Sequence, residues 1–115
     1  MRFCGRKTIN ERHSNTIWLI VLSGVYVDLV VITHGTDTMI TTAQFLAKNE
    51  SLKNKKIVIT GSMRPERFSN TDAPINLGAA IAAVQIVSAG VYVAMHGVVS
   101  PADLASRDME TGQFK

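Results

Sequence analysis

Short apolar runs rich in β-branched residues alternate with longer stretches in which apolar and polar positions are mixed, and the alternation is regular from Leu29 onward. The runs have the composition and length of buried strands. The stretch after the first run repeats apolar residues near the i, i+3, i+4 spacing of a helix, and the stretch after the second contains N-cap candidates and has Pro74 where a first helical turn would lie. The predicted elements are strands at residues 29–33, 56–61 and 91–95 and helices at residues 37–48 and about 74–87.

The order strand, helix, strand, helix, strand is typical of a parallel sheet with crossover helices. We therefore predict an α/β fold, a three-layer domain over residues 29–115 whose parallel sheet has helices as its crossover connections. Because parallel strands end at the same edge of a sheet, the three loops that follow them should leave from one rim.

The two ends of the chain give weaker patterns. Residues 1–28 form an uncertain N-terminal segment, in which the apolar run at residues 17–22 fits either a strand or a helix that packs on the sheet. Thr8 and Glu11 have the spacing of a capping box, which favours a helix from about Ile9. After Gly97 the pattern becomes irregular and predicts no further element.

Polar residues follow each predicted strand. Thr36 and Asp37 follow the first, Ser62 and Met63 the second, and His96 the third. A threonine hydroxyl can act as a nucleophile or a hydrogen-bond donor, and the first role needs a base or a charged neighbour. Thr36 and Asp37 could instead merely cap a helix. The convergence of three polar loops on one rim favours a binding site.

The composition and charge of the chain bear on which classes of protein it can belong to. Apolar residues make up 46% of the 115 residues, enough for one modest core. The net charge of +3 comes from scattered cations without interleaved aromatic residues, so no nucleic-acid partner is expected. No apolar run approaches the ~20 residues of a membrane span, and no signal peptide is evident. The single cysteine, Cys4, fits a reducing compartment, and we predict a cytoplasmic protein.

Three segments of the sequence carry a family resemblance. They read VVITHGTDTM, then VITGSMRP with TDAPINLGAAIAA, then GVYVAMHG, and they run in order over about residues 30–97, with similar flanking sequence to Phe114. The chain resembles the bacterial L-asparaginase/glutaminase family. The resemblance implies an N-terminal α/β domain that hydrolyses a side-chain amide through a threonine nucleophile, with no metal and no organic cofactor.

The resemblance also assigns roles by position. Thr36 resembles the family's second active-site threonine, and Asp37 resembles the acid that holds the α-amino group of the substrate. Ser62 and Met63 match positions whose backbone lines the substrate site. Loop-ordering rather than chemical roles are expected for four more residues: His34, Arg64, Asp72 and Asn76.

Two departures from the family pattern bear on activity. Active members carry an earlier glycine-glycine-threonine loop with the main nucleophile, and this sequence has no such motif. Thr8 lies in a segment that resembles this motif only weakly, and it is too close to Thr36 in the sequence to be the nucleophile. The family's active-site lysine falls on Arg107, which keeps the charge but stays protonated and cannot relay a proton. Arg107 is therefore expected to orient Thr36 or to stabilise an anion.

The family's first strand also has no counterpart in the sequence pattern, which suggests an N-terminally truncated, single-domain type. We expect one edge of the sheet to be poorly covered as a result. Such an edge invites pairing with another chain, so a homo-oligomer is predicted.

These observations predict an asparaginase-family amidohydrolase domain that converts L-asparagine into L-aspartate and ammonia with impaired activity. The predicted catalytic residues are Thr36, Asp37 and Arg107, and the predicted substrate-binding residues are Thr36, Asp37, Ser62 and Met63. One alternative is a non-catalytic domain that retains amino-acid binding or serves in interactions. Another is the amidase subunit of a tRNA-dependent amidotransferase. The preference between asparagine and glutamine stays open.

Overall fold

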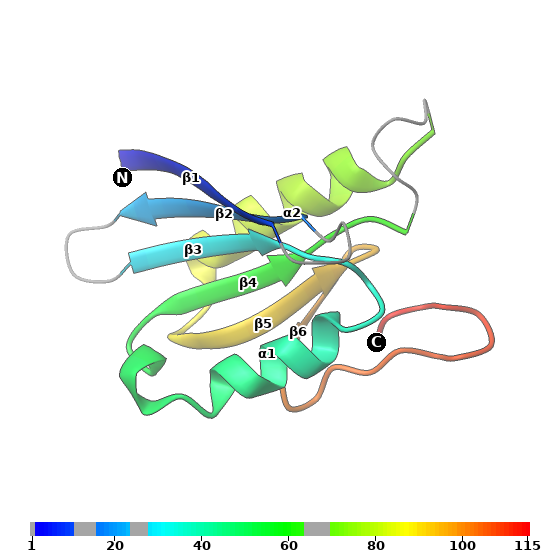
Figure 1. Ribbon diagram of the computed structural model, residues 1–115. Coiled ribbons are helices and arrows are strands. Elements are labelled where there is room, and N and C mark those ends of the chain that lie inside the picture. Colours follow the sequence, from blue (N-terminus) through cyan, green and yellow to red (C-terminus); the bar gives the residue numbers. More distant parts are fainter. Residues whose placement is uncertain (1, 11–15, 24–27, 64–69) are drawn as a thin grey trace.

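The computed structural model describes residues 2–10, 16–23, 28–63 and 70–115. Within these ranges six strands form one sheet in the order β1-β2-β3-β4-β5-β6 (Figure 1). The elements in chain order are β1 (Arg2–Asn10), β2 (Thr16–Ser23), β3 (Asp28–Thr33), α1 (Met39–Ala47), the 3-10 helix η1 (Glu50–Leu52), β4 (Lys56–Thr60), α2 (Ala73–Ile86), β5 (Gly90–Met95) and β6 (Val98–Pro101).

The predicted parallel sheet is confirmed for its three central strands. β3 pairs with β4 in parallel from Leu29↔Lys56 to Thr33↔Thr60, and β4 pairs with β5 in the same sense. α1 and α2 cover opposite faces of this sheet (Figure 1). The fold is therefore the expected three-layer α/β arrangement, although the whole sheet is mixed because its outer strands are antiparallel.

The core consists of two apolar layers, one on each face of the sheet. Along β4, Ile57 and Ile59 pack on the α1 side whereas Val58 packs on the α2 side. All three are at most 3% exposed, because helices cover both faces of the central strands. This explains the continuous apolar runs that mark these strands in the sequence.

Both helices begin within two residues of the predicted positions. α1 has 9 residues and follows Thr38, whereas α2 has 14 residues and has Pro74 in its first turn. The small residues Ala80 and Ala83 let α2 lie close to the sheet. Within the described ranges, no helix has the length and apolar character needed to cross a membrane.

The helix expected from about Ile9 is wrong in the parts of that segment that the structure describes. Thr8 belongs to β1 and pairs with Trp18 of β2, and β2 pairs antiparallel with β3 from Ser23↔Asp28 to Trp18↔Thr33. The run in β2 is rich in β-branched and aromatic residues, which favour strands. Because β2 pairs with β3, the poorly covered sheet edge that we expected does not lie at β3.

The chain after Gly97 is also more regular than predicted. β6 pairs antiparallel with β5, from Met95↔Val98 to Tyr92↔Pro101. The intervening residues His96 and Gly97 have φ values of 54° and 79°, and positive φ at both positions is what a type I′ hairpin turn requires. Histidine is among the non-glycine residues that adopt this conformation more readily, but its frequency there is too low to predict a hairpin.

Candidate active site

The loops after β3, β4 and β5 form one rim at the carboxyl ends of these strands. The first two are joined directly, because the His34 N–H donates to the Thr60 carbonyl at 2.8 Å. At Gly61, a Cβ atom would collide with the His34 carbonyl oxygen and lie 2.8 Å from the Met39 Cε. Only glycine permits this close approach of two backbones.

Asn76 connects the rim to α2. Its Nδ2 donates to the Gly61 carbonyl at 2.9 Å and to Asp72 Oδ2 at 2.8 Å, and its Oδ1 accepts from the His96 N–H at 3.0 Å. Asp72 Oδ2 also accepts from the Met63 N–H at 3.0 Å and lies 3.3 Å from His96 Nε2. Because Asn76 is 1% exposed, its three bonds satisfy side-chain atoms that cannot reach water. Asp72 and Asn76 thus order the loops, as the sequence predicted.

The structure brings Arg107 to the threonine loop from the far end of the sequence. Its Nη1 donates to the Thr36 carbonyl at 3.3 Å and lies 3.3 Å from Asp37 Oδ1. The Arg107 side chain is 20% exposed and that of Asp37 is 95% exposed. The three residues predicted as catalytic are therefore adjacent, with the carboxylate of Asp37 presented to solvent.

A short hairpin near the end of the chain positions Arg107. Ser106 and Lys115 exchange two backbone hydrogen bonds of 3.1 and 2.8 Å, and Arg107 pairs with Phe114 in a β-bridge. The Phe114 ring is 5% exposed and belongs to the core layer under α1. The guanidinium carbon of Arg107 lies 5.5 Å from the centre of this ring, a cation–π contact that orients the side chain.

The turn of this hairpin is held by Asp108, a residue that the sequence analysis missed. Its Oδ1 accepts from the N–H groups of Glu110 and Thr111 at 2.8 and 3.2 Å. These two bonds stabilise the ionised carboxylate and lower the pKa of Asp108 below its ordinary value of 3.8. Gly112 supplies the positive φ of 75°. Aspartate and glycine are both residue types that favour turns, and their occurrence four positions apart could have indicated one here.

Other residues that the sequence analysis singled out lie around Thr36, Asp37 and Arg107. Met63 reaches Arg107, with its Sδ 3.7 Å from Nη2, and Ser62 precedes it on the same loop. The His34 ring contacts its own loop, through the Gly35 carbonyl at 2.7 Å, and Thr42 of α1 at 3.0 Å. These contacts agree with a loop-ordering role for His34. Arg64 lies outside the described residues.

The rim offers a hydroxyl, a carboxylate and a guanidinium within one small area. A carboxylate binds an ammonium group, and a guanidinium binds a carboxylate or holds a neighbouring group in place. In the part of the chain that the structure describes, no three His, Cys, Asp or Glu side chains are grouped so as to hold a metal ion. The arrangement is suited to a small ligand that carries both charges.

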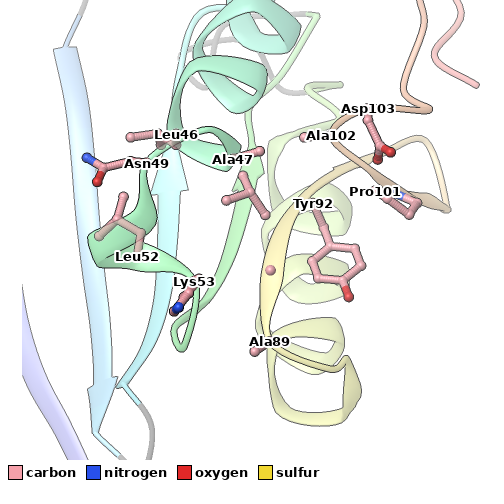
Figure 2. A pocket seen from close by; sticks show the side chains of 12 residues that line it. Leu46, Ala47, Asn49, Leu52, Lys53, Ala89, Tyr92, Pro101, Ala102 and Asp103 are labelled. Atoms are coloured by element: carbon pink, nitrogen blue, oxygen red, sulfur yellow. The ribbon is translucent and has the colours of Figure 1, made fainter.

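A surface cavity of about 340 Å³ lies away from this rim (Figure 2). It is lined by the end of α1, by η1 with the adjacent Lys53, by the amino-terminal part of β5 with Tyr92, and by the end of β6 and the residues that follow it, including Asp103. Tyr92 is anchored there by a 3.0 Å hydrogen bond from its hydroxyl to the Ser88 carbonyl. None of the predicted site residues lines this cavity, so its size alone does not make it the functional site.

Comparison with known proteins places this chain in a family. The family model described as "Asparaginase, N-terminal" matches residues 8–114. The glutaminase-asparaginase of Pseudomonas aeruginosa is 40% identical over 94 residues, and L-asparaginase 2 of Escherichia coli is 37% identical over 106 residues. The crystal structure of a probable cytoplasmic L-asparaginase from Campylobacter jejuni matches with a TM-score of 0.64 and 37% identity.

These matches cover most of this chain but only part of each relative. They span 77%, 83% and 74% of the chain and 26%, 30% and 28% of the Pseudomonas, Escherichia and Campylobacter proteins respectively. The chain belongs to the asparaginase family, and residues 8–114 correspond to its N-terminal domain.

Proposed function

We propose that the rim is an asparaginase-type site that hydrolyses the side-chain amide of L-asparagine to give L-aspartate and ammonia, with impaired activity. Thr36, Asp37 and Arg107 are its catalytic residues, and Thr36, Asp37, Ser62 and Met63 line its substrate site. The observation that carries this proposal is the contact of Arg107 with Thr36 and Asp37 across about 70 residues of sequence. The relatives named asparaginase and glutaminase-asparaginase support the choice of an amide substrate.

In this proposal Asp37 binds the α-ammonium group of the amino acid. Its carboxylate is almost fully exposed, so an incoming ammonium can reach it without displacing a protein group. Arg107 lies on one side and leaves the other carboxylate oxygen available, because its contact is to Oδ1. An ammonium bound there gains a charge-assisted hydrogen bond.

Arg107 holds the backbone of Thr36 and so orients its side chain in the site. The contact is to the Thr36 carbonyl oxygen and leaves the hydroxyl for the substrate. An arginine stays protonated at all relevant pH values, so it cannot take the hydroxyl proton as a general base would. This is the physical reason for expecting impaired hydrolysis.

Replacement of Asp37 by Asn tests the site without removing side-chain volume. Calorimetric titration of the chain with L-asparagine should give binding that is about tenfold weaker in Asp37→Asn, because the amide cannot pair with the ammonium charge. Asp103→Asn is the matched control, since Asp103 lines the distant cavity. Equal binding by the Asp37 variant and the parent chain would contradict the proposed site.

We also infer that the chain is cytoplasmic, like the Campylobacter protein named as a probable cytoplasmic L-asparaginase, and that it associates with copies of itself. Large apolar side chains are exposed on two elements, with Ile75 and Ile86 of α2 at 73% and 84% and Val98 and Val99 of β6 at 40% each. Exposed apolar side chains on a helix face and on an edge strand favour association. Sedimentation velocity should show a species larger than 12.5 kDa whose fraction rises with concentration; a monomer throughout would contradict this.

A further inference from the structure

We propose that Arg107 makes the site select an acidic side chain over its amide, so that it binds L-aspartate more tightly than L-asparagine. This inference rests on the proposed function, because it takes the rim of Thr36 and Asp37 as the amino-acid site. It adds a specificity determinant, with Arg107 as the residue that binds the side-chain carboxylate of the ligand.

The contacts of the guanidinium group leave one nitrogen weakly occupied. Nη1 serves two oxygen acceptors, the Thr36 carbonyl and Asp37 Oδ1. Among the described residues, the acceptor for Nη2 is the thioether sulfur of Met63 at 3.7 Å. A thioether is a weak acceptor, so Nη2 is a charged donor whose hydrogen-bonding capacity is largely unused.

The guanidinium is held in a fixed orientation. Phe114 supports it through the ring contact, and Gly112 leaves room beside it, since a Cβ at that position would lie 3.3 Å from the Met63 Cε and 3.7 Å from Arg107 Nη2. A planar donor group that is already oriented loses little entropy when it binds a planar carboxylate.

The charges of the rim match an amino acid with an acidic side chain. Asp37 binds the ammonium group of the ligand. The adjacent Arg107 then contacts the ligand's side-chain group, which lies beside Thr36 at the position of the amide in the proposed substrate. A carboxylate offers two charged acceptor oxygens to the N–H donors of Arg107. An amide offers one neutral acceptor, and its own N–H₂ group is a donor that cannot pair with a guanidinium.

Ligand titrations of the full chain at pH 7 test this inference. We expect L-aspartate to bind about tenfold more tightly than L-asparagine, which corresponds to about 1.4 kcal/mol. The β-methyl ester of L-aspartate should bind as weakly as asparagine, because it keeps both α-groups and lacks the side-chain charge. This ligand series needs no variant and so does not depend on the folding of a mutant.

Two variants locate the preference at Arg107. In Arg107→Met the ratio of the two dissociation constants should fall to about one, mainly through weaker aspartate binding. Arg107→Lys, which keeps a charge but not the planar fork, should lower the ratio at least about threefold. Lys48→Met is the matched control, since it removes one exposed charge at the far end of α1 and should leave the ratio unchanged.

The outcomes separate this inference from the proposed function. If asparagine binds through Asp37 but the ratio is near one in the parent chain, the specificity role of Arg107 is wrong and the proposed function stands. If Arg107→Met weakens both ligands equally, Arg107 holds the α-carboxylate and the inference is overturned. If neither ligand binds the parent chain, the proposed function and the inference are both wrong.

Discussion

The 115-residue chain, when supplied with L-asparagine, should release ammonia at least about 10⁴-fold more slowly than a full-length relative assayed beside it. In the L-asparaginase/glutaminase family a glycine-glycine-threonine loop carries the main nucleophile, and this sequence contains no such motif. Thr36 would have to act alone, and Arg107 meets it at the carbonyl oxygen rather than at the hydroxyl. What remains is substrate binding and charge stabilisation, which by themselves give slow turnover.

A coupled ammonia-release assay measures this directly, and Thr36→Ala is its control. Ammonia release that persists unchanged in Thr36→Ala would come from a contaminating enzyme. Release at a normal enzymatic rate that Thr36→Ala abolishes would contradict the prediction. Thr36 would then be a nucleophile in its own right, and its hydroxyl would need a base other than Arg107.

The largest effect on stability is expected at Gly61. In Gly61→Ala the new methyl group meets the His34 carbonyl oxygen and the Met39 Cε, which is fully buried in the core layer under α1. Relief of this overlap must separate the loops after β3 and β4 and break the bond between His34 and Thr60. We expect a loss of about 3 kcal/mol in the free energy of unfolding and a fall of about 10 °C or more in Tm.

Gly78→Ala is the matched control for this substitution. Gly78 lies within α2, where a Cβ atom would meet no heavy atom within 4 Å. The same change there should stabilise the chain by about 0.5–1 kcal/mol, because alanine favours the helical backbone and restricts the unfolded chain. Thermal unfolding followed by circular dichroism compares the two, and a Tm for Gly61→Ala at or above that of Gly78→Ala would refute the steric argument.

The central fold could be predicted from the sequence because its signals are local. The apolar runs of β3, β4 and β5, the apolar period of α1 and the N-terminal residues of α2 lie within short windows, and each gave the correct element. The N-terminal segment could not be predicted in this way, since a short apolar run has the same composition in a buried strand as in a buried helix. The antiparallel pairing of β2 with β3 decided between them.

Thr36 and Asp37 could be placed on the rim from sequence alone, because residues that follow a parallel strand lie at the carboxyl edge of its sheet. The family resemblance suggested that Arg107 orients Thr36, but the residue pattern alone did not. The contact itself depends on tertiary structure, because the last hairpin must fold back, with Phe114 in the core and Asp108 holding the turn. No short stretch of the sequence shows that Arg107 lies next to Thr36 and Asp37. The sequence by itself determined the type and order of the central elements and the residues at their ends. Tertiary structure decided which distant side chains meet there, because such contacts depend on long-range packing rather than on local periodicity.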